Sequence, residues 1–174
     1  VRRLLAVLIP LGLAVGGAGA ATVGSDPVLV AHAPTSVSGT EATAVFRVGG
    51  RTVRQVRYAD RERLTYSFVL ENRGRLPVTV AGLAPLPRTP RLFEYVDVTD
   101  GAGRSRFTVP AGGRRTVEVG MVMHACETLS ARAGSFATEV ALRTERAGGL
   151  VHDVVTVTFP EEVHTGSPRE ASCP

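Results

Sequence analysis

Apolar and polar residues alternate with a period of two along most of residues 42 to 159. In the stretch LTYSFVLEN, Tyr66, Phe68 and Leu70 fall on one face, and the residues between them are mostly polar. Because successive side chains of a β-strand point to opposite faces, this pattern predicts strands with one face in a core. No stretch after residue 24 has the longer period of an amphipathic helix.

Turn-forming pairs such as Asp100-Gly101 and Gly148-Gly149 separate the alternating runs. Many short strands between such turns indicate an all-β fold, an antiparallel β-sandwich. Because neighbouring runs can merge, we expect about seven to nine strands. In one run, Phe136, Val140 and Leu142 are expected on the core side. The candidate runs cover residues 28–33, 42–48, 53–59, 64–72, 77–83, 92–98, 105–109, 114–125, 136–145 and 150–159.

The first 24 residues have the pattern of an export signal. Arg2 and Arg3 precede an uncharged apolar run, and Ala18-Gly19-Ala20 is a suitable cleavage site. The alternative is an uncleaved membrane helix, because residues 4–23 form an uncharged stretch just long enough to span a bilayer. Either interpretation places the rest of the chain outside the cytoplasm, secreted or attached to the cell membrane.

Export gives the two cysteines, Cys126 and Cys173, an oxidising environment in which a disulfide bond can form. The bond would tie a C-terminal tail, residues 161–174, to a β-sandwich domain over residues 25–160. We expect Glu161 and Glu162 to be solvated as part of that tail.

Charge and motifs exclude several function classes. All twenty basic residues are arginines, the net charge is +4 and the pI is about 9.8, but acidic residues lie among the arginines. No basic run is interleaved with aromatic residues, which argues against nucleic-acid binding. His152 and Asp153 are adjacent in a predicted strand, so their side chains point apart and cannot act together. We expect no enzymatic activity and no cofactor.

The segments YSFVLENRGRLPVTVAGL and FTVPAGGRRTVEVGM resemble immunoglobulin-like domains of bacterial envelope proteins, of the CARDB and fibronectin-III-like kind. The matching residues are Asn72, Gly74, Pro77, Val78, Val80, Val109, Pro110, Gly112, Thr116, Val117 and Val119. The resemblance implies an immunoglobulin-like sandwich that serves in protein–protein interaction or structural support, with an unknown envelope protein as partner. The Arg-, Ala- and Gly-rich composition indicates a GC-rich genome, which suggests an actinobacterial envelope.

The stretch GMVMHACETL combines residue types that bind copper. By strand alternation, Met121 and Met123 share a face with apolar core positions, whereas His124 and Cys126 fall on the other face. We therefore expect two core methionines, with a copper site built from His124, Cys126 and a methionine as the alternative function.

Two stretches are candidates for an interaction surface. Arg54, Arg57 and Tyr58 lie in the arginine-rich run 51–64, which otherwise predicts a solvated edge strand. Phe93 and Tyr95 lie in the run 91–101, whose two faces are both mixed in polarity, as in an edge strand or a strand in a contact.

Overall fold

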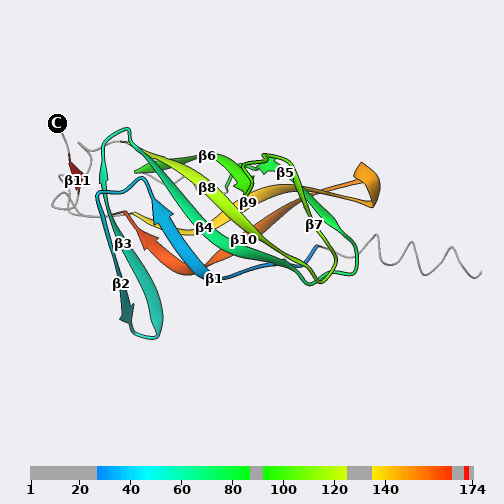
Figure 1. Ribbon diagram of the computed structural model, residues 1–174, viewed down its shortest axis with the longest axis horizontal. Helices are drawn as coiled ribbons and strands as arrows, with labels where there is room; N and C mark the ends of the chain where they lie inside the picture. The colour runs from blue at the N-terminus through cyan, green and yellow to red at the C-terminus, as the bar shows by residue number, and fades with distance from the viewer. Residues whose placement is uncertain (1–26, 87–91, 125–134, 166–170, 173–174) are drawn as a thin grey trace, which may run out of the picture.

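The computed structural model describes residues 27–86, 92–124, 135–165 and 171–172, shown in colour in Figure 1. Within these ranges the regular structure consists of eleven β-strands and one short 3₁₀ turn, η2 (Ala147–Gly149). No helix in the described ranges is long and apolar enough to cross a membrane. Residues 1–26 and both cysteines lie outside these ranges, so the export segment and the disulfide stay predictions.

The first sheet has four antiparallel strands in the order β1-β4-β8-β6. It includes β4, the strand whose alternating residues Tyr66, Phe68 and Leu70 predicted a core face. Its strands are β1 (Leu29–Ser38), β4 (Arg63–Asn72), β8 (Arg114–Met123) and β6 (Phe93–Asp100).

The second sheet has seven strands, in the order β11-β3-β10-β9-β5-β7, with β2 paired to β3. β3 runs parallel to β10 and β11, and the other pairs are antiparallel. Each of the ten candidate runs contains a separate strand, so the expected number of seven to nine strands was too low. The strands are β2 (Ala42–Val48), β3 (Arg51–Ala59), β5 (Val78–Leu83), β7 (Phe107–Val109), β9 (Phe136–Arg146), β10 (Val151–His164) and β11 (Ala171–Ser172).

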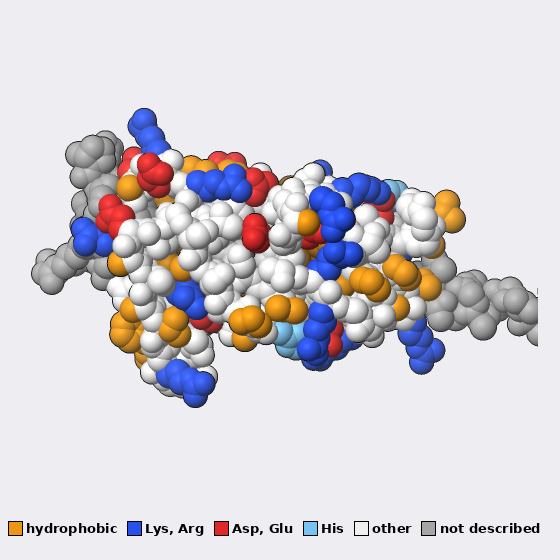
Figure 2. Space-filling view, viewed as in Figure 1, with side chains coloured by type: hydrophobic (Ala, Val, Ile, Leu, Met, Phe, Trp, Pro, Cys, Tyr) orange, Lys and Arg blue, Asp and Glu red, His pale blue; other side chains and the backbone are white. Residues whose placement is uncertain are grey.

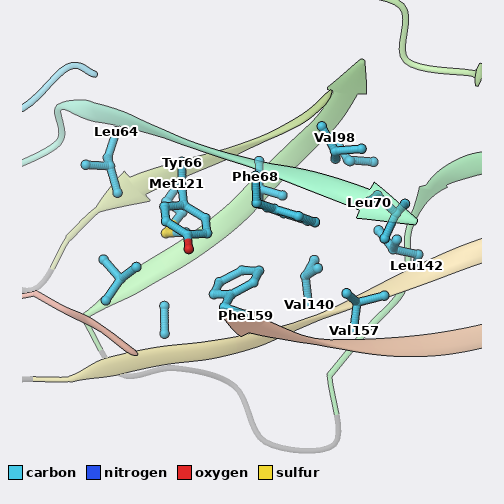
Figure 3. Packing of buried hydrophobic residues seen from close by; sticks show 14 of the residues in the cluster. Leu64, Tyr66, Phe68, Leu70, Val98, Met121, Val140, Leu142, Val157 and Phe159 are labelled. Atoms are coloured by element: carbon cyan, nitrogen blue, oxygen red, sulfur yellow. The ribbon is translucent and has the colours of Figure 1, made fainter. Parts of the chain in front are cut away.

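The core lies between the two sheets, as Figure 3 shows. Tyr66 and Phe68 of β4 face Phe159 of β10, with ring centroids 4.8 and 5.6 Å apart. Val140 and Leu142 of β9 are fully buried beside them. The alternation of β4 therefore predicted the core face correctly, and the fold is an all-β sandwich whose strand pairs are mainly antiparallel.

Two irregularities change the faces that the alternation predicts. Phe136 was expected in the core but is 49% exposed, and Ala137 is buried instead, near a register shift between β9 and β10. In β6 the register against β8 shifts between Tyr95 and Asp97. A bulge of this kind turns the strand, which explains why both faces of this run are mixed in polarity.

The end of β10 also differs from expectation. The strand continues to His164, and Val163 and Thr165 are fully buried. Glu161 is buried too, so the prediction that it belongs to a solvated tail is wrong. The physical reason is a buried ion pair with Arg54 on β3, which local polarity does not reveal.

Candidate interaction surface

Strands β2 and β3 form a hairpin that projects from the sandwich, as Figure 1 shows. Its two-residue turn is Gly49-Gly50, with φ angles of 55° and 81°. Positive φ at both central positions defines the type I′ turn that suits a tight hairpin, and glycine adopts it without strain. In the described part of the chain, β2 pairs with β3 alone, so its other edge is open.

The turn determines which backbone groups of β2 face outward. Val48 pairs with Arg51 across the two-residue turn, so this pair exchanges hydrogen bonds. Hydrogen-bonded and non-bonded pairs alternate along an antiparallel ladder. Thr43, Val45 and Arg47 therefore direct their N–H and C=O groups toward the open edge.

The side chains of β2 are exposed along the whole strand. Val45, Phe46 and Val48 are each about half exposed, and they lie on both faces of the hairpin. Figure 2 shows apolar side chains gathered on this projection. An exposed apolar edge strand is a template for pairing with another chain, and proteins commonly protect such edges. The sequence predicted this strand, but it did not show that the sandwich leaves both of its faces uncovered.

A buried ion pair holds the base of the hairpin. Arg54 Nε donates a hydrogen bond to Glu161 Oε1 at 2.6 Å, and the two side chains are only 12% and 5% exposed. Arg54 Nη2 donates to Thr35 Oγ1 at 3.1 Å, so the guanidinium joins β1, β3 and β10. Burial, together with the nearby charge of Glu161, raises the pKa of Tyr66 far above its usual value. The hairpin thus projects from a tightly fixed base.

The five residues predicted for an interaction surface do not form one exposed patch in the structure. They are Arg54, Arg57, Tyr58, Phe93 and Tyr95. Arg54 is turned inward, and Phe93 is fully buried, so neither is part of an exposed surface. Phe93 packs edge-on against Tyr95 at 5.3 Å, on the core side of β6. Tyr95 is partly buried and its hydroxyl donates to Glu139 O at 2.7 Å. Arg57 is exposed and paired with Glu41 at 2.8 Å.

Tyr58 follows Arg57 on β3, and its side chain is outside the part of the chain that the structure describes. The strand itself is not the edge strand that its arginines predicted, because it pairs with β2, β10 and β11. The edge is β2, one strand further out. The arginine content of β3 therefore predicted the wrong strand as the edge of the sheet.

The residues of the copper alternative are distributed differently. Met121 and Met123 are fully buried between the sheets, as their alternation predicted. His124 directly follows β8, and its backbone N–H donates to Leu92 O at 2.9 Å. Cys126 lies outside the described residues. Among the residues that are described, no three His, Cys, Asp or Glu side chains form a group that could hold a metal ion.

The fold places the chain in a broad class, the two-sheet β-sandwiches. No protein-family model and no curated protein matches it. One similar solved structure is the cupredoxin domain of amoB from Nitrosocaldus yellowstonii, with 11% identity, a TM-score of 0.29 and coverage of 61% of this chain and 60% of that one. Another is an X-ray structure of a Northeast Structural Genomics Consortium target, with 10% identity, a TM-score of 0.33 and coverage of 78% and 87%. Similarities this low identify neither a family nor a function.

Proposed function

We propose that this chain is an exported, non-enzymatic, immunoglobulin-like β-sandwich of the cell envelope that binds another envelope protein along strand β2. The pattern of its first 24 residues supports export, either with cleavage or as a membrane anchor. The all-β sandwich is compatible with the immunoglobulin-like class, whose members serve many interaction and support roles.

The observation that carries the proposal is the open edge of β2. Within the described part of the chain, Thr43, Val45 and Arg47 offer backbone groups that pair with no other strand, and the side chains on both faces of β2 are exposed. An extended segment of the partner can add to this edge as a further strand, with main-chain hydrogen bonds providing affinity. Half-exposed Val45, Phe46 and Val48 favour apolar residues in that segment, and exposed Arg47 favours a carboxylate.

The test compares two substitutions at one position. Val45→Pro removes an N–H that points to the open edge, and leaves the hydrogen bonds between β2 and β3 in place. Val45→Ala removes the side chain but keeps the N–H. Proteins crosslinked to the full chain in intact cells are identified for wild type and both variants. Binding to the purified partner is then measured, and hydrogen exchange is followed at Thr43, Val45 and Arg47.

We expect the bound partner to protect these three amides from hydrogen exchange. Val45→Pro should abolish binding of the partner, whereas Val45→Ala should weaken binding without abolishing it. Equal urea midpoints for the two variants would show that the difference is not one of folding. A partner whose affinity is the same for both variants, or that protects amides elsewhere, would rule out strand addition at β2.

Met121 and Met123, two residues of the copper alternative, are enclosed in the core, and Cys126 lies outside the described residues.

A further inference from the structure

The charged residues of the sandwich are unevenly distributed between its two ends. One end consists of residues 27–29, 71–78, 100–115 and 143–154, which the strand registers bring together. We call it the arginine-rich end. The strands and turns of β4, β5 and β8 contribute Arg73, Arg75, Arg114 and Arg115 to it. The β6–β7 connection and β9 contribute Arg104, Arg106, Arg143 and Arg146.

The carboxylates at this end are too few to neutralise the arginines. Eight arginines face only four carboxylates, which leaves an excess of four positive charges. The Glu71 carboxylate forms ion pairs with both Arg73 and Arg114, with N–O distances of 2.9 Å in each. Asp100 likewise serves Arg104 at 2.5 Å and Arg115 at 3.5 Å.

The described part of the opposite end has the reverse balance. Its described segments, residues 38–64, 92–97, 135–139 and 160–165, hold eight carboxylates and six arginines. The described part of the chain is therefore polarised along its length, and Figure 2 shows several arginine side chains side by side on the positive half. A positive end attracts a negatively charged surface, and at moderate salt this attraction reaches about one Debye length, roughly 8–10 Å.

A hollow with a volume of about 680 Å³ opens at the arginine-rich end. Its lining includes Arg104, Arg106, Arg115 and Arg146, with one carboxylate, Glu145, which pairs with Arg106. Planar guanidinium groups match the geometry of phosphate oxygens, so the hollow suits phosphate groups presented at a surface.

An apolar side chain projects at the same end. Leu150 follows the η2 turn and is 86% exposed, the most exposed large apolar residue in the described chain. Val154, on the adjoining strand, and Val28, just before β1, are also exposed. Arginines combined with a projecting leucine are suited to the interface of an anionic bilayer, where charge attracts and the apolar side chain enters the headgroup region.

The path of the chain agrees with this orientation. Leu29, the first residue of β1, pairs with Asn72 at the arginine-rich end. The uncharged stretch of residues 4–23 ends only a few positions before it. A chain attached to a membrane through that stretch would therefore hold this end nearest the lipid.

We propose that the arginine-rich end binds the surface of an anionic lipid bilayer, with the arginines contacting lipid phosphates and Leu150 entering the headgroup region. The β2–β3 hairpin lies at the opposite end of the sandwich, so bilayer contact leaves it free for a partner.

The test uses tryptophan as a reporter, because the chain contains none. Leu150→Trp is introduced in the full chain, and its emission is recorded with phosphatidylcholine vesicles and with vesicles of equal parts phosphatidylcholine and phosphatidylglycerol. Phe46→Trp, on the hairpin, is the matched control. Arg75→Glu with Arg143→Glu is the charge variant, because no described carboxylate pairs with either arginine and both side chains are exposed.

The expected result is a blue shift of Leu150→Trp with anionic vesicles only, reversed by high salt, and no shift of Phe46→Trp. The charge variant should bind at least about tenfold more weakly, since each arginine near an anionic surface contributes on the order of a fivefold affinity.

Four outcomes would overturn the proposal: no shift, an equal shift with neutral vesicles, an equal shift of Phe46→Trp, or an unchanged affinity of the charge variant. Binding to soluble heparin without a vesicle-dependent shift would also overturn it, and would assign this end to a soluble polyanion. None of these results depends on partner binding at β2, so this proposal and the proposed function fail separately.

Discussion

Arg54 Nε lies 2.6 Å from Glu161 Oε1, and this contact joins β3 to β10 across 107 positions of the chain. The parallel pairing of Arg54 with Val163 brings the two residues together at the base of the projecting hairpin. A buried ion pair contributes little net stability compared with apolar packing, because desolvation of both charges offsets their attraction. Its main consequence is geometric, since it fixes the direction in which the hairpin leaves the sandwich.

Glu161→Ala is expected to destabilise the protein by about 3 kcal/mol or more, because it leaves the Arg54 guanidinium buried without its partner. The measurement is the free energy of unfolding in urea. Glu162→Ala is the matched control: it breaks the neighbouring pair with Arg51, which is 65% exposed, and should cost less than about 1 kcal/mol. The double variant Arg54→Met/Glu161→Leu should recover most of the loss. Equal effects of the two alanine variants would contradict the buried pair.

Asn72 organises the turn between β4 and β5. Its Nδ2 donates to Leu76 O at 2.8 Å and to Val109 O at 3.1 Å, and its Oδ1 accepts from the Gly74 N–H at 2.9 Å. The side chain is fully buried, so Asn72→Ala leaves several polar backbone groups without partners. We expect a loss of about 2–4 kcal/mol in thermal or urea unfolding. Thr79→Ala, which removes an exposed hydroxyl contact with Thr108, should cost less than about 1 kcal/mol.

Glu71 should make stability depend on pH in the acid range. Hydrogen bonds from Arg73, then Arg114 and His32, lower its pKa from 4.5 to about 2. Because the folded-state pKa is depressed, its contribution to stability is present above about pH 4.5 and is lost as the pH falls toward 2. Glu71→Gln removes this contribution, so the variant should lose less stability than wild type between those values.

Urea unfolding at several pH values measures the difference for Glu71→Gln. Glu118→Gln, on the middle of β8 and outside this arginine network, serves as the comparison. Parallel pH profiles of wild type and Glu71→Gln below pH 4.5 would show that the network does not act on the Glu71 carboxylate.

Met121 and Met123 should resist oxidation in the folded protein, because both side chains are fully buried. Hydrogen peroxide treatment followed by mass spectrometry should leave them unmodified in buffer and convert them to sulfoxides in urea. Rapid oxidation in buffer would place at least one thioether at the surface, where it could bind a soft metal.

Cys126 and Cys173 are predicted to be joined by a disulfide bond in the exported protein. Alkylation without reduction, followed by intact mass measurement, should detect no free thiol and a monomer mass. Two free thiols would contradict the bridge and return Cys126 to the list of possible copper ligands, whereas a doubled mass would indicate bridged chains. The same spectrum gives the N-terminal residue and so distinguishes a cleaved from a retained leader.

Strand positions and most core faces followed from the sequence alone. Tyr66, Phe68 and Leu70 were assigned to the core by alternation, because the two-residue period of a strand is a local property of the backbone. The same reasoning assigned Met121 and Met123 to the core and gave all ten candidate runs a strand. Where the period was interrupted by a bulge, as near Phe136, the local pattern predicted the wrong face.

Only the tertiary structure decided what the exposed surfaces are. Glu161 is polar and follows a proline, yet it is buried because a strand far away in the sequence supplies Arg54. Strand β2 looks like any other alternating run, and its open edge exists because no further strand pairs with it among the described residues. The arginines are scattered along the sequence, and the strand registers gather eight of them at one end. Register and sheet order depend on contacts between distant segments, so local alternation determines the strands but not the surfaces that they form together.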